Sequence, residues 1–147
     1  MTSNAVFWKP LGCALKKSLN TQEAYSILDF GPSRGSTWIA GGCAILAHAL
    51  YMIDEFHAGA GAEIVVLKEK IDFEPDHVLL RVDRNVYMDG DGSSTWRTLR
   101  KRWIKEEGMF DPEISDYDPA LLDEIGIPLD PHTSKELAKY LRRKLFI

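Results

Sequence analysis

The segment from Cys43 to about His57 carries apolar side chains at helical spacing around most of its circumference, so this helix must be surrounded by other elements. Its apolar members are Ile45, Leu46, Ala49, Leu50, Met52, Ile53 and Phe56. The most hydrophobic run, Trp38 to Ile53, has 16 residues and is interrupted by two glycines and a histidine. A membrane-spanning helix needs ~18 to 20. We therefore expect a soluble protein, with no membrane partner, built around this central helix.

Length, composition and charge bound the class of protein. The chain has 147 residues, of which 45% are hydrophobic and 27% are charged, as in ordinary globular proteins. This length predicts a single domain over residues 1–147. The net charge of −4 provides no overall positive field, which argues against a nucleic-acid partner. The sequence predicts no particular oligomeric state.

Cysteine usage and the N-terminal sequence indicate a cytoplasmic protein. Cys13 and Cys43 are the two cysteines, too few for the disulfide framework of a small secreted domain. The N-terminus lacks the basic segment and apolar run of a signal peptide. Since free cysteine is among the most buried residue types, we expect Cys13 to belong to the core.

A small antiparallel sheet is predicted after the central helix. Residues 62–67 are rich in β-branched side chains, which is typical of a strand. Residues 77–82 and 86–89 predict two more strands, and the loop 83–85 between them has the turn chemistry of a hairpin. In this hairpin Val82 would pair with Val86. Central helix and sheet together define an α+β fold.

Further helices are predicted on both sides of this core. We expect a short helix from Asn20 to a point before Gly31, one from about Thr95 to Glu107, and a C-terminal helix from Thr133 or Ser134 to Phe146. Residues 1–17 show no sustained period. Residues 31–42 predict a shaped loop, and the proline-rich residues 111–131 predict a surface wrap with a short helix at 120–125.

Cys43 has the local setting of a nucleophile. It follows Gly41 and Gly42 and begins the central helix, where unpaired backbone N–H groups and the positive end of the helix dipole stabilise a thiolate. The glycines would let a substrate approach the backbone closely. The N–H of Cys43 would then help to hold the oxyanion of a tetrahedral intermediate.

A cysteine nucleophile needs an imidazole to take and return a proton, and His77 is the best candidate. The predicted hairpin places position 77 opposite Asp91 and diagonal to Asp89, and all three side chains share one face. Either carboxylate could accept the second ring N–H of His77 and so orient the imidazole. We favour Asp89 because it lies on the strand, whereas Asp91 lies between glycines.

These residues resemble a known family. The run Gly-Gly-Cys-Ala-Ile-Leu-Ala-His-Ala-Leu (41–50), the segment 77–82 and the segment 87–89 are similar to small papain-like cysteine hydrolases of the NlpC/P60 and transglutaminase-like superfamily, which include uncharacterised phage and bacterial domains. The resemblance implies a papain-like fold, in which the helix that carries the cysteine packs on an antiparallel sheet. The core would span about residues 36–92, followed by a helical C-terminal extension at 93–147. Cys43 would be the nucleophile, His77 the base and Asp89 the orienting residue, with no cofactor.

One region departs from the family pattern. Papain-like enzymes often have a Gln or Asn a few residues before the cysteine as a second oxyanion donor, whereas Ser36, Thr37 and Trp38 stand there in this chain. Gln22 would serve only if the N-terminal helix folds over the site. Loss of one oxyanion donor typically costs on the order of 10²- to 10³-fold in rate. A non-catalytic member of the family is therefore a second hypothesis.

The sequence thus predicts a cysteine hydrolase or acyltransferase that acts on an amide, isopeptide or thioester through an acyl-enzyme at Cys43. Its partner would be a peptide-like or acyl substrate. The alternative is a non-catalytic binding protein on the same fold, such as a phage-encoded inhibitor of a host protein. In a third hypothesis the domain is structural, and the Gly-Gly-Cys motif only serves packing.

The remaining histidines and basic residues predict no second site. His48 lies about 140° around the helix from Cys43, so we expect a hydrogen-bonded helix residue. We expect His57 at a helix end and His132 in a loop. No pair of Cys or His has the local spacing of a zinc site, so no metal is expected. The basic residues within 97–105 predict a solvated helix face.

Overall fold

The fold is α+β, with one antiparallel sheet between two layers of helices. The computed structural model describes residues 4–29, 37–39, 41–59, 61–124 and 129–146. Within them, five strands form a sheet in the order β4-β3-β2-β1-β5. The strands are β1 (Glu63–Glu69), β2 (His77–Asp83), β3 (Val86–Asp89), β4 (Gly92–Ser94) and β5 (Pro112–Asp116). All four neighbouring pairs are antiparallel.

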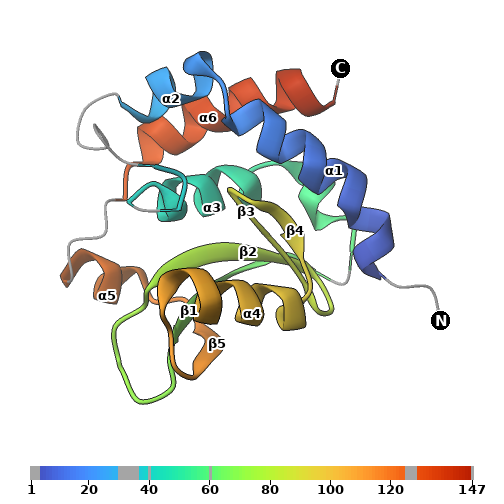
Figure 1. Cartoon of the computed structure of the whole chain (residues 1–147). Coiled ribbons are helices and arrows are strands. Elements are labelled where there is room, and N and C mark those ends of the chain that lie inside the picture. The colour runs from blue at the N-terminus through green and yellow to red at the C-terminus, as the bar shows by residue number, and fades with distance from the viewer. Residues whose placement is uncertain (1–3, 30–36, 40, 60, 125–128, 147) are drawn as a thin grey trace.

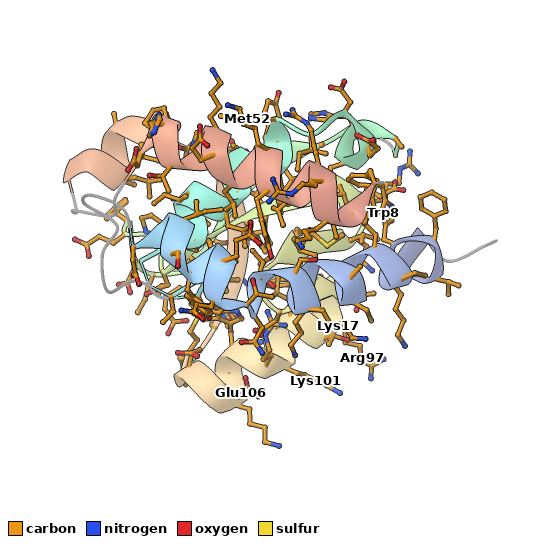
Figure 2. All side chains as sticks on the ribbon, turned by 90° about the horizontal axis from the view of Figure 1, so that it is seen from above. Trp8, Lys17, Met52, Arg97, Lys101 and Glu106 are labelled. Atoms are coloured by element: carbon orange, nitrogen blue, oxygen red, sulfur yellow. The ribbon has the colours of Figure 1, made fainter. Side chains whose placement is uncertain are left out.

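The helices cover both faces of this sheet. They are α1 (Asn4–Leu19), α2 (Gln22–Leu28), α3 (Cys43–Tyr51), α4 (Trp96–Glu107), α5 (Pro119–Glu124) and α6 (Pro131–Leu145), with a 3-10 turn at Asp54–His57. Helix α3 packs on one face of the sheet, and α1, α2 and α6 form an outer layer above it (Figures 1 and 2). Helix α4 covers the opposite face. The predicted central helix is therefore confirmed, because α3 lies between the sheet and the outer helices.

Side-chain alternation on β2 explains why helices are needed on both sides. Leu80 and Val82 belong to the core under α3, whereas Leu79 packs with Leu99 and Trp103 of α4. Successive side chains on a strand point to opposite faces. Because both sets are apolar, each face of the sheet needs a helical cover.

Helix α1 was not predicted, although it carries a core-facing stripe. Trp8, Leu15 and Leu19 are buried on one side of it, but Pro10 and Gly12 interrupt the pattern in the sequence. Gly12 is required for packing, because a Cβ there would lie 2.4 Å from the backbone nitrogen of Ser93 in β4. Pro10 and Gly12 have low helix propensity, so the packing of α1 against β4 must stabilise this helix instead.

Two strands were also missed, and several element bounds differ from those predicted. No strand was predicted at residues 92–94, and residues 112–116 were predicted to lie in a surface wrap, but both segments add edge strands to the sheet. Strand pairing with β1 stabilises residues 112–116, and this long-range partner has no local signal. Helix α3 ends at Tyr51 rather than near His57. Helix α6 begins one turn earlier, with Asp130 as its cap and Pro131 as its first residue.

The hairpin register was predicted correctly over most of its length. Leu80 pairs with Met88 and Arg81 with Tyr87, as expected. The predicted pairing of Val82 with Val86 is wrong, because a bulge lets Asp83 face Val86 instead. Most of the predicted loop 31–42 lies outside the described residues. Across the ranges that the structure describes, no helix is long and apolar enough to cross a membrane.

Candidate active site

Cys43 is the first residue of α3 and follows a turn that only glycine fits. The Gly42 N–H donates a hydrogen bond of 2.7 Å to the Thr37 carbonyl oxygen. A Cβ on Gly42 would lie 2.5 Å from that same oxygen, which is closer than any real contact. Gly41 has a φ of 91°, in the left-handed region that favours glycine. Both glycines therefore contribute to placing the thiol at the start of the helix.

His77 is the first residue of β2 and is bonded to Asp89 at the end of β3. The His77 Nε2 and Asp89 Oδ2 atoms are 2.9 Å apart, and both side chains are buried. The antiparallel pairing of β2 with β3 puts these positions on one face at the same end of the sheet. Asp89, rather than Asp91, is the carboxylate that contacts the imidazole.

Asp89 accepts two further hydrogen bonds that fix its orientation. Arg102 of α4 donates to Asp89 Oδ2 at 3.0 Å, and the backbone N–H of Asp91 donates to Oδ1 at 2.9 Å. The Arg102 Nε also lies 3.5 Å from the Asp91 carboxylate. Sequence reasoning missed Arg102, because it assigned the basic residues of this helix to a solvated face. The available signal was its spacing, since Arg102 adjoins Trp103 on the inner side of α4.

Trp103 packs against the imidazole on the side of α4. The two rings are 4.8 Å apart between centroids and inclined by 33°. Trp103 is itself buried. Its indole excludes water from one side of His77, which strengthens the electrostatic contact of His77 with Asp89.

Cys43 and His77 interact although they belong to different layers. Because Nε2 of His77 is bonded to Asp89, Nδ1 is the ring nitrogen that remains for the thiol. Among the described residues Nδ1 has no hydrogen-bond partner of standard geometry. The two side chains are nevertheless close enough for each to shift the pKa of the other. The fold thus brings together a thiol, an imidazole and a carboxylate that lie far apart in the sequence.

The charges of this set favour a thiolate beside an imidazolium. Burial acts to raise the pKa of Cys43, but the neighbouring imidazole of His77 and its charge, with the N–H groups of Val78 and Ala44, bring that pKa below its usual value. Burial acts to lower the pKa of His77, but contacts with Asp89 and Cys43 raise it to about 9. Burial also acts to raise the pKa of Asp89, and His77 and Arg102 outweigh it and hold this pKa below its usual value.

The site is well shielded. Cys43 retains 4% of its surface, His77 0% and Asp89 3%. Leu122 of α5 packs in the same buried cluster as Cys43. A dry environment strengthens each charged contact within the set and limits the size of the group that reaches the sulfur.

The other candidate residues take different places. Thr37 holds the glycine turn through its carbonyl oxygen. Trp38 is buried, and its Nε1 donates to the Leu19 carbonyl oxygen at 2.9 Å, so this N–H is not a second oxyanion donor. Gln22 begins α2 with an exposed side chain and does not belong to the buried set. Ser36 lies outside the described residues.

Predictions for the remaining cysteine and histidines had mixed outcomes. Cys13 is exposed on α1 rather than part of the core. His48 is a hydrogen-bonded helix residue as predicted, 2.5 Å from the Tyr117 hydroxyl. His57 ends the 3-10 turn, but His132 lies in α6 and not in a loop. In the part of the chain that the structure describes, no three His, Cys, Asp or Glu side chains are arranged to hold a metal ion.

Comparisons with known proteins found no match for this chain from which a function could be inferred. No family model matches it, and neither the curated proteins nor the solved structures contain a match. The functional argument therefore rests on the geometry of Cys43, His77 and Asp89.

Proposed function

We propose that the protein is a cysteine hydrolase or acyltransferase of the papain-like type, acting on a peptide-like or acyl substrate with an amide, isopeptide or thioester bond. The observation that carries this proposal is the chain of contacts from Cys43 through His77 to Asp89, with the sulfur at a helix N-terminus. A purely structural cysteine needs neither the imidazole nor the carboxylate.

The mechanism follows from which atom each residue offers. His77 takes the proton of Cys43 through Nδ1, and the thiolate attacks the substrate carbonyl carbon to form a tetrahedral intermediate. Backbone N–H groups of the first turn of α3 hold its oxyanion. His77 then returns the proton to the leaving amine or thiol as its bond to carbon breaks, which leaves a thioester on Cys43. Water, deprotonated by His77, or a second acceptor releases the acyl group.

Asp89 orients the imidazole throughout this cycle and does not contact the substrate. Its carboxylate holds the Nε2–H of His77, so that Nδ1 faces the thiol. Arg102 and the Asp91 N–H hold Asp89 in turn. Asp89 and Arg102 are therefore positioning residues, and Cys43 and His77 are the groups that react.

A second candidate function is a non-catalytic binding protein that recognises another protein, such as a host protein, through its surface. Ile71, Phe73 and Phe110 are 87% exposed or more. Their loops are joined, because the Phe110 N–H donates to Glu69 at 2.8 Å and the Lys70 N–H donates to the Asp111 carbonyl oxygen at 3.0 Å. Exposed aromatic residues of this kind mark interaction surfaces.

A labelling experiment separates the two functions. The exposed Cys13 must first be removed, so the parent protein is Cys13→Ser. We expect a small peptidyl vinyl sulfone to label this parent at a single site. Labelling should vanish in the parent carrying Cys43→Ala and fall at least about tenfold with His77→Gln. Unchanged binding of a partner by the Cys43→Ala protein, with no labelling of the parent, would instead favour the binding protein.

A further inference from the structure

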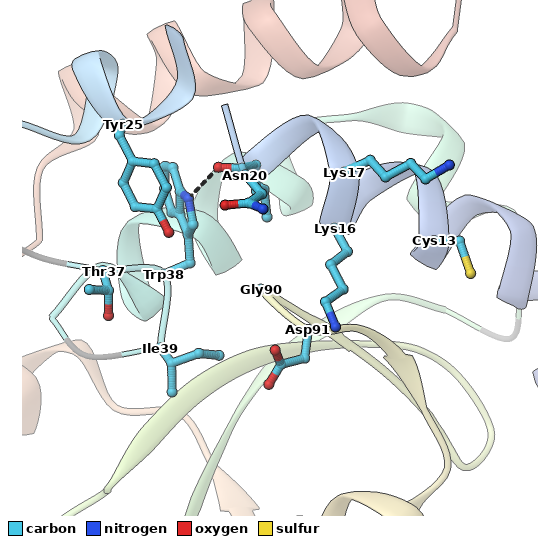
Figure 3. Close-up of a pocket in the computed structure, with 11 residues that line it drawn as sticks. Cys13, Lys16, Lys17, Asn20, Tyr25, Thr37, Trp38, Ile39, Gly90 and Asp91 are labelled. Atoms are coloured by element: carbon cyan, nitrogen blue, oxygen red, sulfur yellow. Dashed lines mark hydrogen bonds between the residues drawn. The ribbon is translucent and has the colours of Figure 1, made fainter. Parts of the chain in front are cut away.

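A cavity of about 690 Å³ is lined by segments that neighbour Cys43 and Asp89 along the chain, and it has no part in the chemistry proposed above. The end of α1, Tyr25 of α2, residues 37–39, and Gly90 with Asp91 between β3 and β4 form its walls (Figure 3). Sites for small ligands typically have volumes of about 300 to 1,000 Å³. The cavity therefore has room for an amino-acid side chain together with part of its backbone.

Two walls of this cavity are continuous with the site. Gly90 and Asp91 directly follow Asp89, and the Asp91 N–H donates to the Asp89 carboxylate at 2.9 Å. The Thr37 carbonyl oxygen accepts the Gly42 N–H next to Cys43. The segments that line the cavity therefore also hydrogen-bond the residues that position the thiol and the imidazole.

One wall is aromatic and fixed in place. Tyr25 and Trp38 lie with ring centroids 5.6 Å apart, and the Trp38 Nε1 donates to the Leu19 carbonyl oxygen at 2.9 Å (Figure 3). Gly90 permits this placement, since a Cβ there would lie 2.7 Å from the Cβ of Trp38. Rigid aromatic rings contact the aliphatic part of a ligand at little cost in entropy.

The opposite rim is cationic. Lys16 and Lys17 are exposed in the last turn of α1, and neither takes part in an ion pair among the described residues. Among the described residues that line the cavity, Asp91 supplies the one carboxylate, and it is offset by Arg102 at 3.5 Å. A chain of net charge −4 thus gathers positive charge at this rim.

We propose that this cavity binds a carboxylate-bearing side chain of the substrate, such as that of glutamate. The aliphatic stem lies on Tyr25 and Trp38, and the carboxylate is attracted by Lys16 and Lys17, with the Asn20 amide beside them. The assignment of the ligand as substrate rests on the proposed function; the binding of the carboxylate does not.

The test is a binding titration that needs no chemistry. The protein carries Cys43→Ala, and the probes are acetyl-Ala-Glu-Ala-amide and acetyl-Ala-Gln-Ala-amide, which differ in charge but hardly in shape. NMR follows the indole N–H of Trp38 and the backbone amide of Asn20. We expect the Glu peptide to bind about threefold to tenfold more tightly than the Gln peptide, as partly exposed charge pairs allow.

Matched variants locate the source of this preference. Lys16→Gln with Lys17→Gln should abolish it, whereas Lys9→Gln, an exposed lysine on the same helix outside the cavity, should leave it unchanged. Equal binding of both peptides, no shift at Trp38, or a preference that survives the double variant would overturn the proposal. Displacement of the Glu peptide by an equal concentration of inorganic phosphate would also overturn it, because the site would then be an unselective anion site.

The binding and labelling results together distinguish a failure of this proposal from a failure of the proposed function. Selective binding of the Glu peptide, combined with a Cys43 that no vinyl sulfone labels, would refute the hydrolase and retain the cavity. Labelling of Cys43 with no preference for the Glu peptide would do the opposite.

Discussion

Arg102 and His77 contact the same carboxylate oxygen, Oδ2 of Asp89, at 3.0 and 2.9 Å. One comes from helix α4 and the other from strand β2, so this oxygen joins two layers of the fold at the candidate site. Because Arg102 and His77 share this carboxylate, we expect the charge state of His77 to depend on Arg102 as well.

Removal of Arg102 should therefore change both stability and the site. In Arg102→Gln, Asp89 loses a charged partner next to a buried position, and we expect a loss of about 1 to 3 kcal/mol in the free energy of unfolding. Denaturant unfolding measures this loss. Lys101→Gln, at the exposed neighbouring position, is the control and should stay within about 0.5 kcal/mol of the parent. Equal effects of the two substitutions would contradict the role of Arg102.

Asp89→Asn should lower the reactivity of Cys43. Asparagine keeps the shape of the side chain but removes the charge that raises the pKa of His77. The imidazolium is then less stable and the thiolate less populated, so alkylation of Cys43 at pH 7 should slow by about tenfold or more. The rate of iodoacetamide alkylation in a Cys13→Ser background measures this. Asp91→Asn serves as the matched control, with an expected change below about threefold.

Stability should fall as the pH rises through the titration of His77. Its pKa is raised to about 9 in the folded protein from an ordinary value of 6.5, so the folded state binds this proton more tightly than the unfolded chain does. The resulting stabilisation is fully present below pH ~6.5 and is lost as the pH rises through ~9. Denaturant midpoints at several pH values should show this decline in a Cys43→Ala background, which removes the thiol whose lowered pKa has the opposite effect on stability. If His77→Gln shows the same decline, the assignment to His77 is wrong.

The glycine turn before Cys43 should tolerate no side chain at position 42. In Gly42→Ala the new Cβ would meet the Thr37 carbonyl oxygen at 2.5 Å, and we expect a loss of about 1 to 3 kcal/mol together with slower alkylation of Cys43. Gly108→Ala is an informative control. Gly108 has a φ of 72° in open space at the end of α4, so its substitution should cost about 1 kcal/mol through backbone strain and leave Cys43 unaffected.

The sequence predicted those parts of the fold that have local signals. The helix at Cys43, the hairpin strands and the pairing of Leu80 with Met88 follow from apolar spacing and turn chemistry. Strand β5 and helix α1 were missed, because their order depends on partners distant in the chain. Propensity describes only the segment itself, and tertiary contacts override it.

The candidate site shows the same division. Cys43, His77 and Asp89 could be chosen from residue type, order and strand register, and the structure brings them together. Arg102 was missed, because the basic residues of α4 were assigned together to a solvated face although Arg102 adjoins the buried Trp103. The burial of Cys43 at 4% exposure and the exposure of Cys13 were likewise set by packing between helices and sheet.

The pH dependence of Cys43 alkylation tests the central claim most directly. In the Cys13→Ser protein, iodoacetamide should react with Cys43 at a rate that stays high well below the ordinary thiol pKa of 9.0, because His77 holds the thiolate. With His77→Gln in the same background, the rate at neutral pH should drop and the profile should shift upward. A parent profile that rises only near pH 9, or no reaction of the folded protein at any pH, would contradict an activated thiol at this site.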